Sequence, residues 1–284
     1  MLKKDGHTHT RYSHHGSQEA LSDYLDKAIA LGFDEYVVTE HAPLPTRFLS
    51  AFNQPIAARY NSALTKAELP IYKKLVDDAQ QQYAQRLLIK KGFEVDYLPG
   101  YEEETLKFLK EQANWLDEVI LSVHFLPNQA GDLAALDYDA LTFEKYFGLD
   151  LVDPQALFQR YFTAVLASIE LANQTNMRVR IGHLTLIRIY QKRFKLPPFS
   201  ADTLVQIEQV LQAIKAGGHQ LDYNAAGFRK PDNGESYPTL AIVRRAIQLG
   251  IPLVYGSDAH QVSDLGQHYD EMQNNIKKYL DLYE

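Results

Sequence analysis

The feature of this sequence that most constrains its fold is a set of histidines and carboxylates spread along the whole chain. The first of them lie in Asp5-Gly6-His7-Thr8-His9. Residues two apart on an extended strand point to the same side, so His7 and His9 would present two imidazoles together. Imidazole is the commonest protein metal ligand near neutral pH. We expect the remaining ligands of such a site to come from later in the chain.

Short apolar runs alternate with amphipathic segments along the sequence. After the opening segment, the runs that predict strands are residues 36–41, 87–98, 118–124, 177–183, 220–224 and 251–256. The segments that predict helices are residues 17–32, 101–117, 154–175, 200–217, 238–250 and 264–282, with Ser17 and Ser200 as N-caps. Seven strands alternating with helices predict a parallel sheet with right-handed crossovers.

Polar residues gather at the C-terminal ends of these predicted strands, at positions 7/9, 40/41, 94, 124, 183 and 258/260. Strand ends converge on one point only if the sheet closes, and β/α barrels carry their sites on that face. An open doubly wound sheet would place its site at one switch point instead. The pattern favours a single-domain barrel over residues 1–284, with insertions at about 42–86 and 125–153. Residues 125–153 are expected to be loop-like.

Charge and composition narrow the function classes. A net charge of -7 argues against a broad nucleic-acid surface, which needs clustered Lys and Arg. The absence of cysteine excludes thiolate ligands and disulfides and fits a reducing cytoplasm. The N-terminus has no apolar signal region, and no run approaches the ~20 apolar residues of a membrane span. We expect a cytoplasmic protein with neither nucleic acid nor membrane as a partner.

The candidate metal ligands exceed what one ion needs, because a catalytic zinc uses about three protein ligands plus water. They are His7, His9, His15, His41, Glu94, His124, His183, Asp258 and His260. Two or three divalent ions are therefore predicted, and Glu94 is the predicted bridge between two of them. Metal ions ~3.5–4 Å apart suit in-line displacement at phosphorus.

Several motifs, taken in order, resemble the PHP superfamily, named for polymerases and histidinol phosphatases. They are Asp5-Gly6-His7-Thr8-His9, Thr39-Glu40-His41, Phe93-Glu94, Ser122-Val123-His124, Gly182-His183 and Gly256-Ser257-Asp258-Ala259-His260. Further segments resemble the bacterial histidinol-phosphate phosphatases of this superfamily: His14-His15-Gly16, Glu40-His41-Ala42-Pro43-Leu44-Pro45, Gly182-His183-Leu184-Thr185 and Asn224-Ala225-Ala226-Gly227-Phe228-Arg229-Lys230-Pro231. One HxH pair is a weak signal, whereas this ordered series is a strong one.

The resemblance implies a distorted seven-stranded (β/α)7 barrel with up to three metal ions at the C-terminal ends of the strands. The first ion would take His7, His9, Glu94 and Asp258, and the second Glu94, His124 and His183. The third would take His15, His41 and His260. His14 adjoins His15, and either could be the ligand. Zinc is the expected metal, with iron or manganese as alternatives.

The resemblance also implies an activity: hydrolysis of the phosphomonoester L-histidinol phosphate in histidine biosynthesis. Glu94 would bridge the metals, and Asp258 and His260 are the nearest candidates to protonate the leaving alcohol. The phosphate would be held by Arg229 or Arg160, and the substrate's amino and imidazole groups by Glu40 or Glu235. Asp5 is expected to orient a ligand imidazole through its second nitrogen.

Three other functions compete with this interpretation. A PHP-type phosphodiesterase or nuclease is disfavoured by the acidic charge. A non-catalytic PHP interaction module is disfavoured by the complete ligand set. An amidohydrolase-type deaminase also uses an HxH motif in a metal barrel, but the early positions of His15 and His41 argue against it.

Overall fold

The computed structural model describes residues 2–51 and 61–280. Its centre is one seven-stranded sheet with the order β1-β2-β3-β4-β7-β8-β9, and every neighbouring pair is parallel. The strands are β1 (Lys4–Asp5), β2 (Glu35–His41), β3 (Leu88–Asp96), β4 (Glu118–Ser122), β7 (Val179–Ile181), β8 (Gln220–Asn224) and β9 (Leu253–Gly256). The seven predicted strands and their parallel arrangement are confirmed.

The two edge strands of this sheet meet each other. The backbone N–H of Gly6 donates to the carbonyl of Tyr255 at 2.8 Å. Farther along, the Asp258 N–H donates to the carbonyl of His7 at 2.8 Å. These bonds bring the segment after β1 against β9, so the sheet closes as a distorted barrel. The predicted (β/α)7 barrel is confirmed, and an open doubly wound sheet is excluded.

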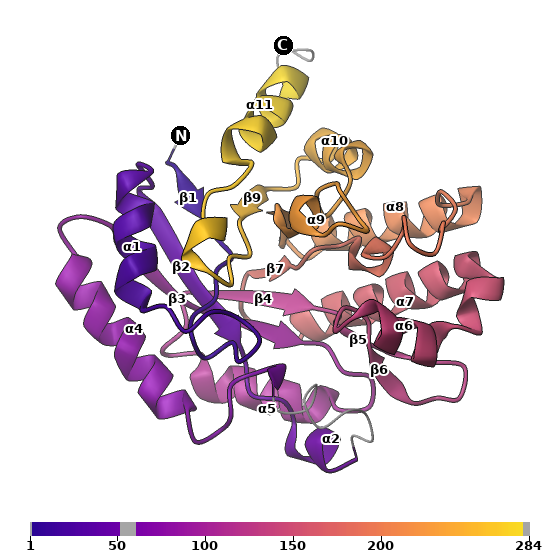
Figure 1. Cartoon of the computed structure of the whole chain (residues 1–284), viewed down its shortest axis with the longest axis horizontal. Helices are drawn as coiled ribbons and strands as arrows, with labels where there is room; N and C mark the ends of the chain where they lie inside the picture. Colours follow the sequence, from indigo (N-terminus) through magenta and orange to yellow (C-terminus); the bar gives the residue numbers. More distant parts are fainter. Residues whose placement is uncertain (1, 52–60, 281–284) are drawn as a thin grey trace.

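Helices lie around the barrel, and all of the long ones except the C-terminal α11 connect one strand to the next (Figure 1). They include α1 (Leu21–Ala30), α4 (Leu69–Tyr83), α5 (Glu102–Gln112), α7 (Pro154–Ala172), α8 (Ala201–Ala216), α10 (Leu240–Gln248) and α11 (Tyr269–Leu280). Helix α7 follows the predicted periodicity, because Leu157, Phe158, Phe162, Val165 and Ile169 are buried on one face. Among the described helices, none combines the length and apolarity that crossing a bilayer requires.

The connections after the strands contain short elements that face the open end of the barrel. They are α2 (Thr46–Ala51) after β2, η2 (Leu186–Arg188) after β7, α9 (Ala226–Arg229) after β8 and η3 (Val262–Asp264) after β9. Residues 125–153 hold an antiparallel hairpin of β5 (Phe125–Pro127) and β6 (Leu133–Ala135), then α6 (Ala140–Phe147) and η1 (Asp150–Val152). The expectation of a loop there is wrong, because Asp139 caps α6 by accepting the Thr142 N–H at 2.7 Å.

The two predicted serine caps have different outcomes. Ser200 caps α8, since its hydroxyl accepts the backbone N–H of Thr203 at 3.2 Å. Ser17 does not cap α1, which begins only at Leu21. The Ser17 hydroxyl instead donates to Glu19 at 2.6 Å, so the chain between the first histidines and α1 is held by a local side-chain bond.

A buried arginine and several partly buried charged residues connect the strands of the barrel. Arg180 on β7 is 1% exposed, and its guanidinium donates to the carbonyl of Gly6 and to Glu118 on β4. Lys4 on β1 pairs with Glu118 and lies 2.8 Å from Glu35 on β2. These pairs connect strands β1, β2, β4 and β7. Gly6, which accepts from Arg180, directly precedes the first candidate ligand, His7.

Candidate metal centre

His7 and His9 lie just beyond the end of β1, and both are completely buried. Their ring centroids are 5.2 Å apart. Strand β1 itself ends at Asp5. The two histidines are instead held by a bridge between Thr8 and Ala259, in the segment after β9. The two imidazoles lie close together, as predicted, although the local backbone differs from the expected strand.

Glu94, at the end of β3, occupies the centre of the cluster and is 2% exposed. One carboxylate oxygen, Oε2, lies 3.2 Å from His7 Nε2 and 3.4 Å from His9 Nε2. The same oxygen lies 3.2 Å from Nδ1 of His41, the last residue of β2. Three imidazoles, two from the segment after β1 and one from the end of β2, therefore converge on one carboxylate oxygen.

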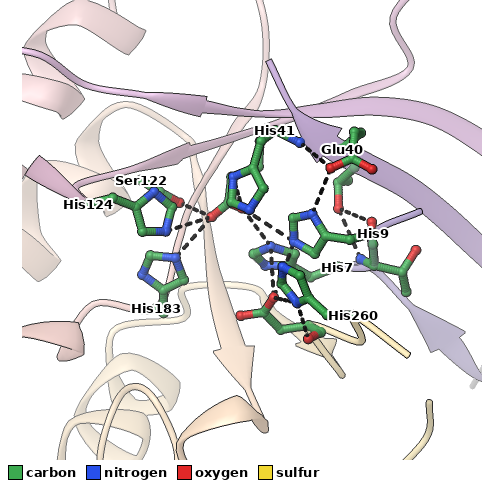
Figure 2. Close-up of polar contacts among 12 residues, drawn as sticks. His7, His9, Glu40, His41, Ser122, His124, His183 and His260 are labelled. Carbon is green, nitrogen blue, oxygen red and sulfur yellow. Dashed lines mark hydrogen bonds and ion pairs between the residues drawn. The ribbon is translucent and has the colours of Figure 1, made fainter. Parts of the chain in front are cut away.

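The other oxygen of Glu94, Oε1, faces a second group of imidazoles. It lies 2.9 Å from His183 Nε2 and 3.6 Å from His124 Nε2, and it accepts a 2.6 Å hydrogen bond from Ser122. Figure 2 shows His124, His183 and Ser122 on one side of the cluster and His7, His9 and His260 on the other. Each oxygen of Glu94 thus serves a separate set of imidazoles, as the predicted bridging role requires.

Side-chain donors of three groups lie within 4.8 Å of one another and are able to hold metal ions. The groups are His7, His9 and Glu94; Glu94, His124 and His183; and His9, His41 and His260. The second group is the set implied by the resemblance, and the first contains three of its four implied residues, without Asp258. The third contains His9 where His15 was expected.

His15 nevertheless lies at the cluster, with its ring 4.6 Å from that of His260 and 5.3 Å from that of His41. Its Nδ1 lies 2.8 Å from the carbonyl oxygen of Asn61, so Nε2 is the nitrogen left for a metal ion. His14 instead pairs with Glu68 at 3.2 Å. The geometry favours His15 over His14 as the ligand.

Asp258 completes the group around the first two histidines. Its Oδ1 lies 3.2 Å from His9 Nε2 and 3.8 Å from His7 Nε2. The residue has a φ of 52°, a left-handed conformation that is uncommon for residues other than glycine. Such strain is concentrated at functional sites. A residue in this conformation therefore places its carboxylate against both imidazoles.

Three buried carboxylates hold ligand imidazoles from behind. Asp222 Oδ2 lies 2.8 Å from His7 Nδ1, and Asp96 Oδ1 lies 2.7 Å from His124 Nδ1. Glu40 Oε1 lies 3.3 Å from His9 Nδ1. In each case Nδ1 is occupied and Nε2 faces the cluster, which is the usual arrangement around metal-bound histidine. Sequence reasoning missed Asp222 and Asp96 in this role, although Asp96 lies two residues beyond Glu94 on the same strand.

Asp5 does not orient an imidazole, so that expectation is wrong. Its Oδ1 accepts the backbone N–H of Ser257 at 2.9 Å and that of His7 at 3.4 Å. Burial raises the pKa of Asp5 to about 7, and these backbone bonds only partly oppose the rise. Asp5 therefore fixes the backbone that carries the ligands, while Asp222 holds the His7 ring.

The charges of the cluster are strongly coupled. Burial opposes ionisation of Glu94, but the imidazoles of His7, His124 and His41 hold its pKa well below the usual value. Burial also opposes protonation of His9, yet its hydrogen bonds to Asp258 and Glu40 raise its pKa to about 9. The carboxylates are therefore ionised near neutral pH, and protons on imidazoles supply the compensating positive charge.

The donor atoms fit divalent metal ions. Several buried imidazole nitrogens have no hydrogen-bond partner among the described residues: His7 Nε2, His260 Nε2, His183 Nδ1 and both nitrogens of His41. Unpaired buried polar atoms are costly, and native proteins rarely tolerate so many in one place. Zinc accepts imidazole and carboxylate ligands of this kind. A set of two or three metal ions would satisfy these nitrogens and replace the protons on the imidazoles.

The cluster forms one wall of a cavity of about 500 Å³. Its lining includes His15, His41, Glu94, His124, His183, Asp258 and His260, together with Phe125, Asp137, Tyr138, Arg229, Lys230 and Tyr237. Of the two arginines predicted to bind phosphate, Arg229 lines this cavity. Its Nη2 donates to the carbonyl of Asp258 at 3.0 Å, and its Nη1 is buried with no partner among the described residues.

Three other predicted substrate-binding residues are not among the residues that line this cavity. Arg160, on α7, donates to Asp150 at 2.7 Å. Glu40 is completely buried behind His9, where it accepts the backbone N–H of Thr10 at 2.9 Å. Glu235 accepts from Gln191 at 2.9 Å. Each is engaged by protein groups, which the sequence alone did not reveal.

The chain is similar to known proteins over nearly its whole length. Residues 5–226 match the model of the PHP domain family, and residues 241–284 match that of the PHP-associated family. The histidinol-phosphatase of Bacillus subtilis is 36% identical over 95% of this chain and 98% of its own length. The histidinol-phosphatase of Saccharomyces cerevisiae is 22% identical over 96% of this chain and 87% of its own.

Two crystal structures share the fold. A candidate histidinol phosphatase from Listeria monocytogenes has a TM-score of 0.88 at 37% identity, covering 95% of this chain and 99% of that one. Histidinol phosphate phosphatase from Lactococcus lactis, complexed with zinc, L-histidinol and phosphate, has a TM-score of 0.67 at 21% identity, covering 98% of this chain and 93% of that one. The family match, the 36% identity and the barrel with its ligand groups agree: the chain belongs to the PHP family.

Proposed function

We propose that this protein is a histidinol-phosphatase, which hydrolyses L-histidinol phosphate to L-histidinol and phosphate in histidine biosynthesis. The full-length similarity to the histidinol-phosphatase of Bacillus subtilis supports this activity. The observation that carries the chemistry is Glu94, whose two oxygens face separate groups of imidazoles on the wall of one cavity. Two or three divalent ions, with zinc expected, would occupy these groups.

Bound metal ions would supply an activated water and neutralise charge on the phosphoryl oxygens. The residues of the chain prepare the place for this chemistry. Asp222, Asp96 and Glu40 occupy Nδ1 of three ligand histidines and so aim Nε2 at the cluster. Arg229 adds a guanidinium to the lining of the cavity, and the unpaired Nη1 of this guanidinium is suited to a phosphate oxygen.

Asp258 and His260 are better explained as ligands than as donors of the leaving-group proton. Burial opposes ionisation of Asp258, but His7 and His9 beside it hold its pKa well below the usual value. For His260, burial and the positive charge of His9 hold the pKa well below the usual value. Near neutral pH, Asp258 is therefore an ionised carboxylate and His260 a neutral imidazole, so neither is in its acidic form. Both retain lone pairs that suit metal binding.

Steady-state turnover of a substrate panel tests the proposed function. L-Histidinol phosphate should be hydrolysed with a kcat/KM at least about 100-fold above that of simple alkyl phosphates and of dinucleotides. Turnover of dinucleotides without turnover of histidinol phosphate would identify a phosphodiesterase instead. A protein that binds metal and hydrolyses none of the panel would be the non-catalytic PHP module.

A further inference from the structure

Asp137 lines the cavity directly after the β5–β6 hairpin. In that hairpin Phe125 pairs with Ala135, and the next backbone bond runs from the Leu136 N–H to the carbonyl of His124 at 2.8 Å. The hairpin therefore fixes Asp137 beside a ligand of the second imidazole group. Residues 125–153 were expected to be loop-like, with aromatic side chains there as candidates to stack on the substrate's imidazole, and Asp137 was not among the predicted substrate-binding residues.

Asp137 differs from the other carboxylates of the cavity in being unpaired. Glu94 and Asp258 contact the ligand imidazoles, Asp96 holds His124, and Asp264 lies 3.5 Å from Arg229. Asp137 has no hydrogen bond or ion pair with any residue that the structure describes. A carboxylate facing a cavity without a protein cation is suited to a cation brought by the ligand.

The neighbours of Asp137 leave this position to a ligand. Tyr237, which lines the same cavity, has a buried hydroxyl without a partner in the described part of the chain. Burial and the charge of Asp137 raise the pKa of Tyr237 well above its usual value, so its hydroxyl stays neutral.

We propose that Asp137 binds the ammonium group of the substrate's leaving alcohol and makes the enzyme selective for phosphate esters of amino alcohols. This proposal rests on the proposed function. Arg229 follows β8 and Asp137 follows the hairpin after β4, with β7 and its ligand His183 between them. A substrate whose phosphate lies at Arg229 and the ligand cluster can therefore direct a nearby ammonium toward Asp137.

The ammonium is a better match for Asp137 than the imidazole of histidinol. An alkylammonium is charged at neutral pH, whereas an imidazole with a pKa of about 6.5 is mostly neutral. In histidinol phosphate the amine is on the carbon next to the CH2–O–P group, so it lies close to the phosphate. Phe125 and Tyr138, which also line the cavity, offer aromatic surface for the ring.

The test compares Asp137→Asn with the unmodified, metal-loaded enzyme on three substrates. They are L-histidinol phosphate, its analogue without the amine (3-(imidazol-4-yl)propyl phosphate) and L-phenylalaninol phosphate, which keeps the amine and lacks the imidazole. For Asp137→Asn, kcat/KM should fall about 10- to 100-fold on both amines and change less than about 3-fold on the amine-free ester. Asp137→Glu should restore part of the preference for amines.

Asp132→Asn is the matched control, because it removes the same charge from an exposed position on the same hairpin. It should leave all three rates unchanged. An equal loss on all substrates, a loss confined to the imidazole esters, or no loss at all would overturn the proposal for Asp137. Failure of the proposed function is separately visible, since the unmodified enzyme would then not hydrolyse histidinol phosphate.

Discussion

His7 Nδ1 and Asp222 Oδ2 lie 2.8 Å apart, although β9 separates their strands in the barrel. Gly256 on β9 makes this contact possible. A Cβ at Gly256 would lie 2.5 Å from His7 Cβ and 2.7 Å from Asp222 Oδ1. Asp222 and His7 therefore meet because the barrel closes, although the strands β8 and β1 are not adjacent.

Replacing Asp222 should weaken the metal centre while leaving its ligands in place. Asp222→Asn removes the carboxylate that holds the His7 ring, and loss of such a partner typically costs 10- to 100-fold in metal affinity, so a fall of about that size is expected. Competition with a chelator of known affinity measures it. Asp78→Asn, which removes a charge from the exposed face of α4, is the control and should leave the affinity unchanged. Equal affinities for the two variants would contradict this role.

Arg229 should contribute to phosphate binding without holding metal. Arg229→Ala is expected to lower kcat/KM for histidinol phosphate by about 100-fold, because a charged hydrogen-bond donor to the phosphoryl group is lost. The metal content should stay constant by elemental analysis. Arg245→Ala, at a surface pair with Glu208, should leave the kinetics unchanged. A parallel loss of metal in Arg229→Ala would show that the residue acts through Asp258 instead.

Gly182→Ala should disturb the second imidazole group. A Cβ at this position would lie 2.1 Å from Ser122 Oγ, which donates to Glu94 Oε1. The displaced hydroxyl would take the Glu94 carboxylate with it, so we expect the loss of about one metal equivalent along with activity. Elemental analysis checks this outcome. Ser122→Ala, which removes the hydroxyl but adds no bulk, should retain more metal than Gly182→Ala.

The pH dependence of stability should have opposite signs with and without metal. Hydrogen bonds to carboxylates raise the pKa of His9 to about 9, against the opposing effect of burial. A raised folded-state pKa stabilises the metal-free protein fully below the unfolded value of about 6.5, and this contribution is lost as pH rises through about 9. Metal binding needs the neutral imidazole, so its apparent affinity rises over the same range.

The difference in Tm between zinc-loaded and chelator-treated protein should therefore grow between pH 6.5 and 9. Differential scanning calorimetry at several pH values, at constant ionic strength and total zinc, measures this difference. A difference that shrinks as pH rises would show that protons on these imidazoles do not compete with metal.

The strand ends could be predicted from the sequence, because a short apolar run followed by a histidine or a carboxylate is a local pattern. Glu94, His124 and His183 came from such runs, whereas His7 and His9 came from their spacing of two residues. Asp222 and Asp137 could not be found in this way. The role of Asp222 depends on barrel closure across Gly256, and that of Asp137 on a hairpin whose strands have only three residues each. Three-residue strands leave too little alternation to recognise.

The substrate contacts show the same limit of local patterns. Arg229 and Arg160 carry the same charge, and the sequence does not distinguish an arginine that faces the cavity from one that pairs with Asp150. Glu40 adjoins His41 in the sequence, yet its side chain lies behind His9. Neighbouring residues on a strand point to opposite sides, so proximity in sequence to a ligand does not place a side chain in the cavity.

The shared role of Glu94 is tested most directly by the number of metal ions bound to Glu94→Gln, His183→Ala and the unmodified protein. Elemental analysis after purification without chelators should give at least two equivalents for the unmodified protein. His183→Ala should lose about one equivalent, and Glu94→Gln, folded by circular dichroism, should lose more than His183→Ala. A single equivalent in the unmodified protein, or equal losses in the two variants, would contradict a metal centre built on Glu94.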